Sequence, residues 1–128
     1  MVRSWLAVLG VLALLAGCSS APLRGITRAI GTTAEKQLAA GIRSYEDGRY
    51  DAAAKLLRGS LAAGLRLKYD KINAHKYLAF VDCVSGRERQ CHDEFRKVLE
   101  LDPTFELGKA EAGHPIWGPV FRSVKDGK

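Results

Sequence analysis

The feature that most constrains the fold is a long helical pattern that starts at Ala34. Apolar residues recur there at spacings of three and four, which is typical of amphipathic helices, and no proline follows until Pro103. Two glycine-containing breaks, at residues 48–51 and 85–87, divide the pattern. No stretch alternates between apolar and polar residues as a strand would. The sequence therefore predicts an all-α fold.

The breaks separate four predicted helices. The first carries Leu38, Ile42 and Tyr45, the second spans Ala53 to Leu61, the third Ile72 to Val84, and the fourth Cys91 to Leu101. The last of these stops before Pro103, because a proline disfavours helical conformation in the residue before it. We expect the four helices to pair as two hairpins.

The two predicted hairpins match each other at four kinds of position. These are a small residue in the first helix (Gly41, Ala79), a glycine in the turn (Gly48, Gly86), a small residue in the second helix (Ala53, Cys91) and a large apolar residue after it (Leu57, Phe95). This pattern over residues 34–103, with Leu-Asp-Pro closing the second copy, resembles the tetratricopeptide repeat. The turn glycines are 38 residues apart, against the usual 34. We expect the extra residues of this longer spacing near Leu65 to Lys71, as a longer helix or a loop.

Two repeats are fewer than the three that such arrays usually need to cover their apolar faces. In the tail, Pro115 can start a helix, and an apolar stripe follows at Ile116, Trp117, Val120, Phe121 and Val124. We therefore predict two tetratricopeptide-like helical hairpins plus a capping helix at residues 114–125. A homodimer through the apolar stripe of the tail is the other way to complete the array.

The N-terminal residues have the pattern of an export signal. Arg3 precedes an apolar run from Trp5 to Leu15, which is too short for a permanent membrane span. The run ends in Leu15-Ala16-Gly17-Cys18, which resembles the bacterial lipobox. That resemblance implies lipidation of Cys18 after cleavage. It gives a signal peptide at 1–17, a lipidated N-terminus and tether at 18–33, and one domain at 34–128.

The residue after the lipobox and the net charge bear on location and partners. Ser19, rather than an aspartate, resembles the lipoproteins that are sorted to the outer membrane, so we expect a lipid anchor on its periplasmic face. The net charge of +6 would suit anionic head groups or an acidic partner, or is simply a solvated basic surface. Nucleic acid is not expected as a partner in this compartment.

Two cysteines remain in the predicted domain. Cys83 and Cys91 flank the second turn at similar distances, so in an antiparallel hairpin they face each other, and an oxidising compartment would let them form a disulfide. The alternative is a metal site formed by both cysteines with His92, with or without His75. The spacing of the cysteines is unusual for zinc, and the adjacent residues Cys91 and His92 point about 100° apart on a helix. A disulfide is the prediction.

No arrangement of residues points to catalysis. His75, His92 and His114 are scattered, and no serine or cysteine lies in a recognisable nucleophile motif. Glycine-rich phosphate loops are also missing. We expect neither an enzyme nor a bound cofactor or metal.

Helical repeats of this kind generally bind proteins through the first helix of each pair, which lines a concave surface. By that resemblance the partner-binding residues are Ile42, Tyr45, Asn73, Lys76 and Phe80. The strip from residue 74 to residue 121 is also similar to short tetratricopeptide lipoproteins of proteobacteria, some of which accompany type VI secretion clusters while others resemble pilotins. The resemblance implies a membrane-tethered adaptor that helps to assemble an envelope machine. A structural or sensing lipoprotein that binds peptidoglycan or a small ligand is the alternative.

Overall fold

The computed structural model describes residues 32–127. The predicted signal peptide at 1–17, the lipidation site Cys18 and nearly all of the tether lie outside the described residues. The helices are α2 (Thr33–Glu46), α3 (Tyr50–Ala63), α4 (Lys68–Val84), α5 (Glu88–Leu101), α6 (Lys109–Ala112) and α7 (Trp117–Lys125). The all-α prediction is confirmed. Among residues 32–127, no helix has the length and apolar character needed to cross a membrane.

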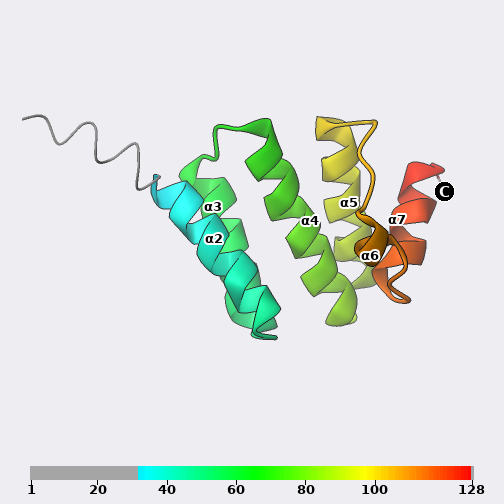
Figure 1. The fold of residues 1–128 in the computed structure, drawn as a ribbon, viewed down its shortest axis with the longest axis horizontal. Coiled ribbons are helices and arrows are strands. Elements are labelled where there is room, and N and C mark those ends of the chain that lie inside the picture. Colours follow the sequence, from blue (N-terminus) through cyan, green and yellow to red (C-terminus); the bar gives the residue numbers. More distant parts are fainter. Residues whose placement is uncertain (1–31, 128) are drawn as a thin grey trace, which may run out of the picture.

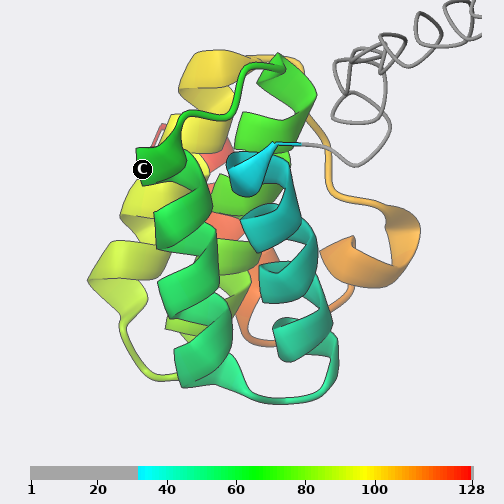
Figure 2. The ribbon, with the colours of Figure 1, turned by 90° about the vertical axis from the view of Figure 1, so that its left-hand side faces the viewer.

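The helices pair as predicted, α2 with α3 and α4 with α5. Figure 1 shows them side by side along the molecule, and Figure 2 shows α2 and α6 on one side with α3 and α5 on the other. The last helix, α7, packs mainly on α5 and to a lesser degree on α4. In the same way, α4 packs mainly on α3 and to a lesser degree on α2. The capping helix α7 is therefore placed against the second hairpin as α4 is placed against the first.

The two hairpin turns are built alike. Gly48 and Gly86 both adopt left-handed backbone conformation, with φ of 73° and 75°, which glycine reaches without a steric penalty. In each turn the N–H of the following residue donates to the carbonyl five positions earlier, at 2.8 Å in both cases. This is the hydrogen bond with which glycine-ended helices commonly close. The internal repeat inferred from sequence is therefore present in the backbone.

The extra residues that separate the two turn glycines, beyond the usual repeat length, lie mostly in a longer helix. α4 has 17 residues, whereas α2, α3 and α5 have 14 each. It begins at Lys68, so the predicted start at Ile72 was one turn too late. Ile72 is the first buried residue of α4, so the turn before it adds nothing to the buried apolar stripe from which the start of the helix was predicted.

The predicted capping helix is present but starts later than expected. It begins at Trp117 rather than His114, and Pro115 lies in the preceding turn. Trp117 and Phe121 are buried and pack on the second hairpin, whereas Ile116 is 48 % exposed. Ile116 is about 100° away from the buried stripe, because it precedes Trp117 by one residue. Trp117 and Phe121 of the predicted stripe are thus covered within the chain, whereas Val120 and Val124 are only partly buried.

Within the described residues, the core consists of two clusters, and α4 contributes to both. Leu78 and Val81 belong to the cluster between the first hairpin and α4. Phe80 and Cys83 belong to the cluster that includes α5 and α7. Because α4 packs on both sides, many of its residues are buried, and its partly exposed residues Asn73, Lys76 and Tyr77 carry part of the candidate site.

Gly41 tests the close approach of the two helices in the first hairpin. A Cβ placed there would lie 2.8 Å from Cγ of Leu57, which is fully buried. We expect Gly41→Val to lower the free energy of unfolding by about 1–3 kcal/mol, because the crowded side chain has no free volume to move into. Urea unfolding followed by circular dichroism measures this. The matched control is Gly59→Val in α3, where a Cβ would meet only the end of the Gln37 side chain, at 3.3 Å. An equal loss in both variants would contradict the close-packing argument.

Candidate functional site

Tyr45 is the centre of an aromatic group that joins the first helices of the two hairpins. Its ring centroid lies 5.2 Å from that of Tyr77 in α4, in an edge-on arrangement, and 5.9 Å from that of Tyr50 in α3. Tyr45 and Tyr77 are both partly exposed. Their rings therefore fill the junction between α2 and α4 and still present an edge to solvent.

Lys76 lies beside these rings and is held by a residue that sequence reasoning missed. Its ammonium group donates to a carboxylate oxygen of Glu111 at 2.6 Å, and it stands 4.7 Å from the centre of the Tyr77 ring. The Lys76 side chain is only 12 % exposed. Since Glu111 comes from the short helix α6, this ion pair fastens the segment after α5 to the face of α4.

Burial changes the acid–base behaviour of both tyrosines. Burial is the main cause that raises the pKa of Tyr45 to about 12, and the neighbouring phenols of Tyr50 and Tyr77 and the carboxylate of Glu111 add to it. Burial also raises the pKa of Tyr77, with a further contribution from Glu111. Both side chains therefore remain neutral hydroxyl donors throughout the physiological range.

The predicted partner-binding residues do not all reach the surface. Tyr45, Asn73 and Lys76 are partly exposed, and Asn73 lies on the same stripe of α4, one turn before Lys76. Ile42 is partly buried against the first core cluster. Phe80 is 1 % exposed, so its assignment as a contact residue is corrected: it is a core residue. Phe80 is buried because its ring stacks on Trp117 at 4.3 Å, a contact made by the capping helix.

We call the surface formed by Tyr45, Asn73, Lys76, Tyr77 and Glu111 the first-helix face. It offers two phenol groups, one amide and one largely buried ion pair. Such groups make hydrogen bonds and ring contacts at protein interfaces, where tyrosine is enriched.

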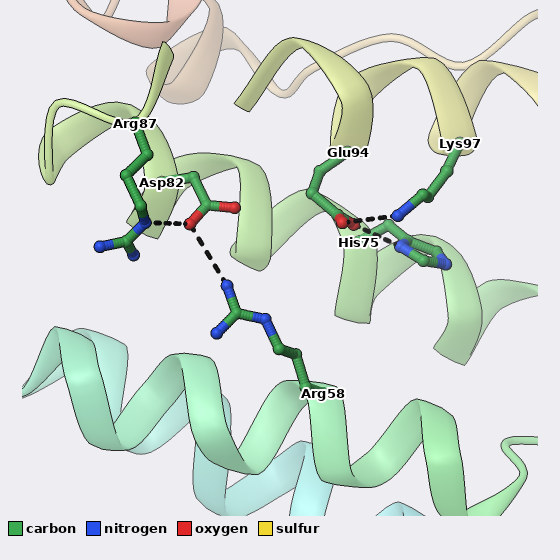
Figure 3. Close-up of polar contacts among 6 residues, drawn as sticks. All are labelled: Arg58, His75, Asp82, Arg87, Glu94 and Lys97. Atoms are coloured by element: carbon green, nitrogen blue, oxygen red, sulfur yellow. Dashed lines mark hydrogen bonds and ion pairs between the residues drawn. The ribbon is translucent and has the colours of Figure 1, made fainter. Parts of the chain in front are cut away.

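Figure 3 shows a second set of charged residues, which connects α3, α4 and α5. Asp82, whose side chain is 2 % exposed, accepts a hydrogen bond from Arg87 Nε at 2.8 Å, and a guanidinium nitrogen of Arg58 in α3 lies 3.5 Å away. A buried carboxylate needs such partners to offset its lost hydration. Asp82 therefore ties the second turn to the first hairpin and has a structural role.

Glu94 forms the other connection shown in Figure 3. It lies within 2.6 Å of His75 Nδ1 in α4 and 2.8 Å of the Lys97 ammonium group. Burial by itself would raise the pKa of Glu94, but the hydrogen bonds from His75 and Lys97 outweigh it and lower the pKa. The carboxylate is thus ionised at neutral pH and links α4 to α5.

The predicted disulfide is present. Cys83 and Cys91 are joined across the second turn, with a Cα–Cα distance of 5.1 Å. Their sulfurs consequently do not act as thiolate ligands, which removes the alternative of a metal site built on them with His92. In the part of the chain that the structure describes, no group of three or more histidine, cysteine, aspartate or glutamate residues is placed to hold a metal ion.

The raised pKa of Tyr45 predicts a loss of stability in alkali. Above pH 10 the unfolded chain loses the phenol proton, whereas the folded chain keeps it until about pH 12. Deprotonation therefore favours unfolding, and the free energy of unfolding falls as pH rises from about 10 to 12. Tyr45→Phe has no such proton to lose, so we expect a shallower fall, measured by urea unfolding at pH 9 and 11. Tyr69→Phe, at a side chain that is 70 % exposed, is the control and should keep the wild-type slope. A Tyr45→Phe slope equal to wild type would contradict the prediction.

Comparison of the chain with protein-family models, with curated proteins and with solved structures gives no match.

Proposed function

We propose that this protein is a membrane-tethered adaptor of the bacterial periplasm that binds another protein through its first-helix face. The observation that carries the proposal is the pairing of two partly exposed tyrosines, Tyr45 and Tyr77, from the first helices of the two hairpins. In tetratricopeptide arrays, which the sequence resembles, this is the side that receives a partner. The two similarly built turns support that relationship.

The proposed partner is one peptide segment or one helix of a larger protein. The face spans only two hairpins, so its affinity for such a segment is expected to be modest. A lipid anchor at Cys18 would compensate by confining the adaptor and its partner to the same membrane surface, which raises their effective concentration. We place the protein at the periplasmic face of the outer membrane, as an accessory assembly factor of an envelope secretion machine of type VI or similar kind.

Two features support the compartment. The sequence Leu15 to Cys18 has the pattern of a lipobox behind an export signal. The disulfide between Cys83 and Cys91 is the kind of bond that persists in oxidising compartments such as the periplasm.

The test is a crosslinking pull-down of the native protein from membranes, with the captured proteins identified by mass spectrometry. Tyr45→Ala/Lys76→Glu removes one ring and reverses one charge of the first-helix face. Because both residues also make internal contacts, Asn73→Glu is a second variant that disturbs the same face at a residue for which the structure shows no such internal bond. Lys55→Glu, at an exposed residue of α3 on the other layer, is the control, and thermal melting establishes that each variant is folded.

We expect envelope proteins to be captured by the wild type and by the α3 control, and to be lost with both variants of the face. If both variants of the face still capture the same proteins, the adaptor function is retained, but the first-helix face is refuted as its binding surface. Capture of no protein, together with binding to purified peptidoglycan sacculi, would refute the adaptor and favour the wall-binding alternative.

A further inference from the structure

The connection between α3 and α4 and the first turn of α4 each expose one large apolar side chain, Leu67 and Tyr69. Tyr69 is 70 % exposed and Leu67 is 62 % exposed, the highest values among the large apolar residues of the described chain. The other two exposed residues of this kind, Tyr50 and Ile116, reach 39 % and 48 %. Neighbouring Leu65 is 4 % exposed, so the connection is anchored to the core while its next residues face outward.

Cations alternate with these apolar residues. Arg66, Lys68 and Lys71 accompany Leu67 and Tyr69, and Asp70 is the single carboxylate between them. Within residues 32–127 none of the three cations belongs to an ion pair. Long cationic side chains and tyrosine rings both place an apolar body against hydrocarbon and a polar end in the head-group region. The composition thus matches a bilayer surface that carries negative charge.

The position of the connection points to the same partner. It lies at the end of the bundle where α2 begins (Figure 1), and Arg66 is close enough to Glu35, in the first turn of α2, to contribute to lowering its pKa. The residues before Thr32 therefore join the domain at this end. Between Cys18 and Thr32 there are 13 residues, whose reach is at most about 45 Å. A lipid anchor at Cys18 would hold this end of the domain within that distance of the membrane.

We propose that Arg66, Leu67, Lys68, Tyr69 and Lys71, which we call the α3–α4 patch, dock on an anionic lipid bilayer. The argument from position rests on the proposed lipid tether, whereas the exposure and charge of the patch do not. Docking fixes the orientation of the bundle: the α3–α4 patch faces the lipid, and the turns at Gly48 and Gly86 point away from it. The first-helix face then runs along the side of the bundle, open to a partner in the periplasm.

Residue-specific quenching tests the docking. The mature protein, which begins at the lipidated Cys18, is reconstituted in vesicles of phosphatidylglycerol and phosphatidylethanolamine, with brominated phosphatidylglycerol as the quencher. Tyr69→Trp reports on the patch, and Tyr50→Trp reports on an exposed tyrosine at the opposite end. Subtracting the emission of the unsubstituted protein removes the signal of Trp117, because Trp5 lies in the predicted signal peptide.

We expect the added emission of Tyr69→Trp to be quenched at least about twofold more than that of Tyr50→Trp, because brominated acyl chains quench only rings at or below the head groups. Adding Arg66→Glu/Lys68→Glu to Tyr69→Trp should remove most of the quenching. Equal quenching at positions 69 and 50, or no quenching at position 69, would overturn the proposal. Neither result bears on partner capture by the first-helix face, so the two proposals fail separately.

Discussion

Phe80→Ala is expected to lower the free energy of unfolding by about 3–5 kcal/mol, the range for removing a buried phenylalanine ring. Phe80 is 1 % exposed and stacks on Trp117 at 4.3 Å between ring centroids. It also meets Phe95 of α5 at 6.1 Å and Tyr77 at 5.7 Å. The ring is thus the contact through which the capping helix, the second hairpin and the first-helix face are joined. Its removal leaves a cavity where three elements meet.

Urea unfolding at neutral pH, followed by circular dichroism, measures this loss. The matched control is Phe105→Ala, because Phe105 is partly exposed and its ring contact is with Phe121, at 6.0 Å. We expect the control to lose clearly less stability than Phe80→Ala. Similar losses in the two variants would contradict the central position given to Phe80.

Reduction of the disulfide is the second large effect. The bond between Cys83 and Cys91 closes a short loop, with a sequence separation of 8, and the chain-entropy relation gives a stabilisation of about 2.5 kcal/mol for a loop of this size. For a domain of about 100 residues this corresponds to a fall in melting temperature of about 10–20 °C when a reductant is added. Thermal melting with and without dithiothreitol measures the shift.

The third cysteine supplies the control for this experiment. Cys18→Ser should keep the full shift, whereas Cys83→Ala/Cys91→Ala should melt at the same temperature with and without reductant. If the wild type shows no shift, or if both thiols are alkylated without prior reduction, the disulfide does not form in solution and the argument for an oxidising compartment is lost.

Much of the fold could be predicted because its signals are local. The two turn glycines, the apolar spacing of three and four, and the proline after α5 are each read within a few residues. The start of α4 was missed because its first turn, residues 68–71, contains no buried residue. α6 was missed because four residues, Lys-Ala-Glu-Ala, carry no periodic apolar pattern.

The candidate site was harder to predict because its contacts are distant in sequence. Tyr45 and Lys76 could be named from their places on the first helices. The pairing of Lys76 with Glu111 joins residues 35 positions apart, and no local pattern indicates it. Phe80 was misjudged for a related reason: its burial depends on Trp117, and the sequence could not tell which residues of α4 the capping helix would cover.

The central claim is that the first-helix face receives a protein partner, and site-specific photo-crosslinking tests it most directly. A photoreactive benzoylphenylalanine is placed at Asn73, on that face, or at Lys55, exposed on α3, and cells that produce either protein are irradiated. We predict a discrete crosslinked protein of the envelope from position 73 and none from position 55. The same adduct from position 55 with none from position 73, or no adduct from either, would contradict the claim.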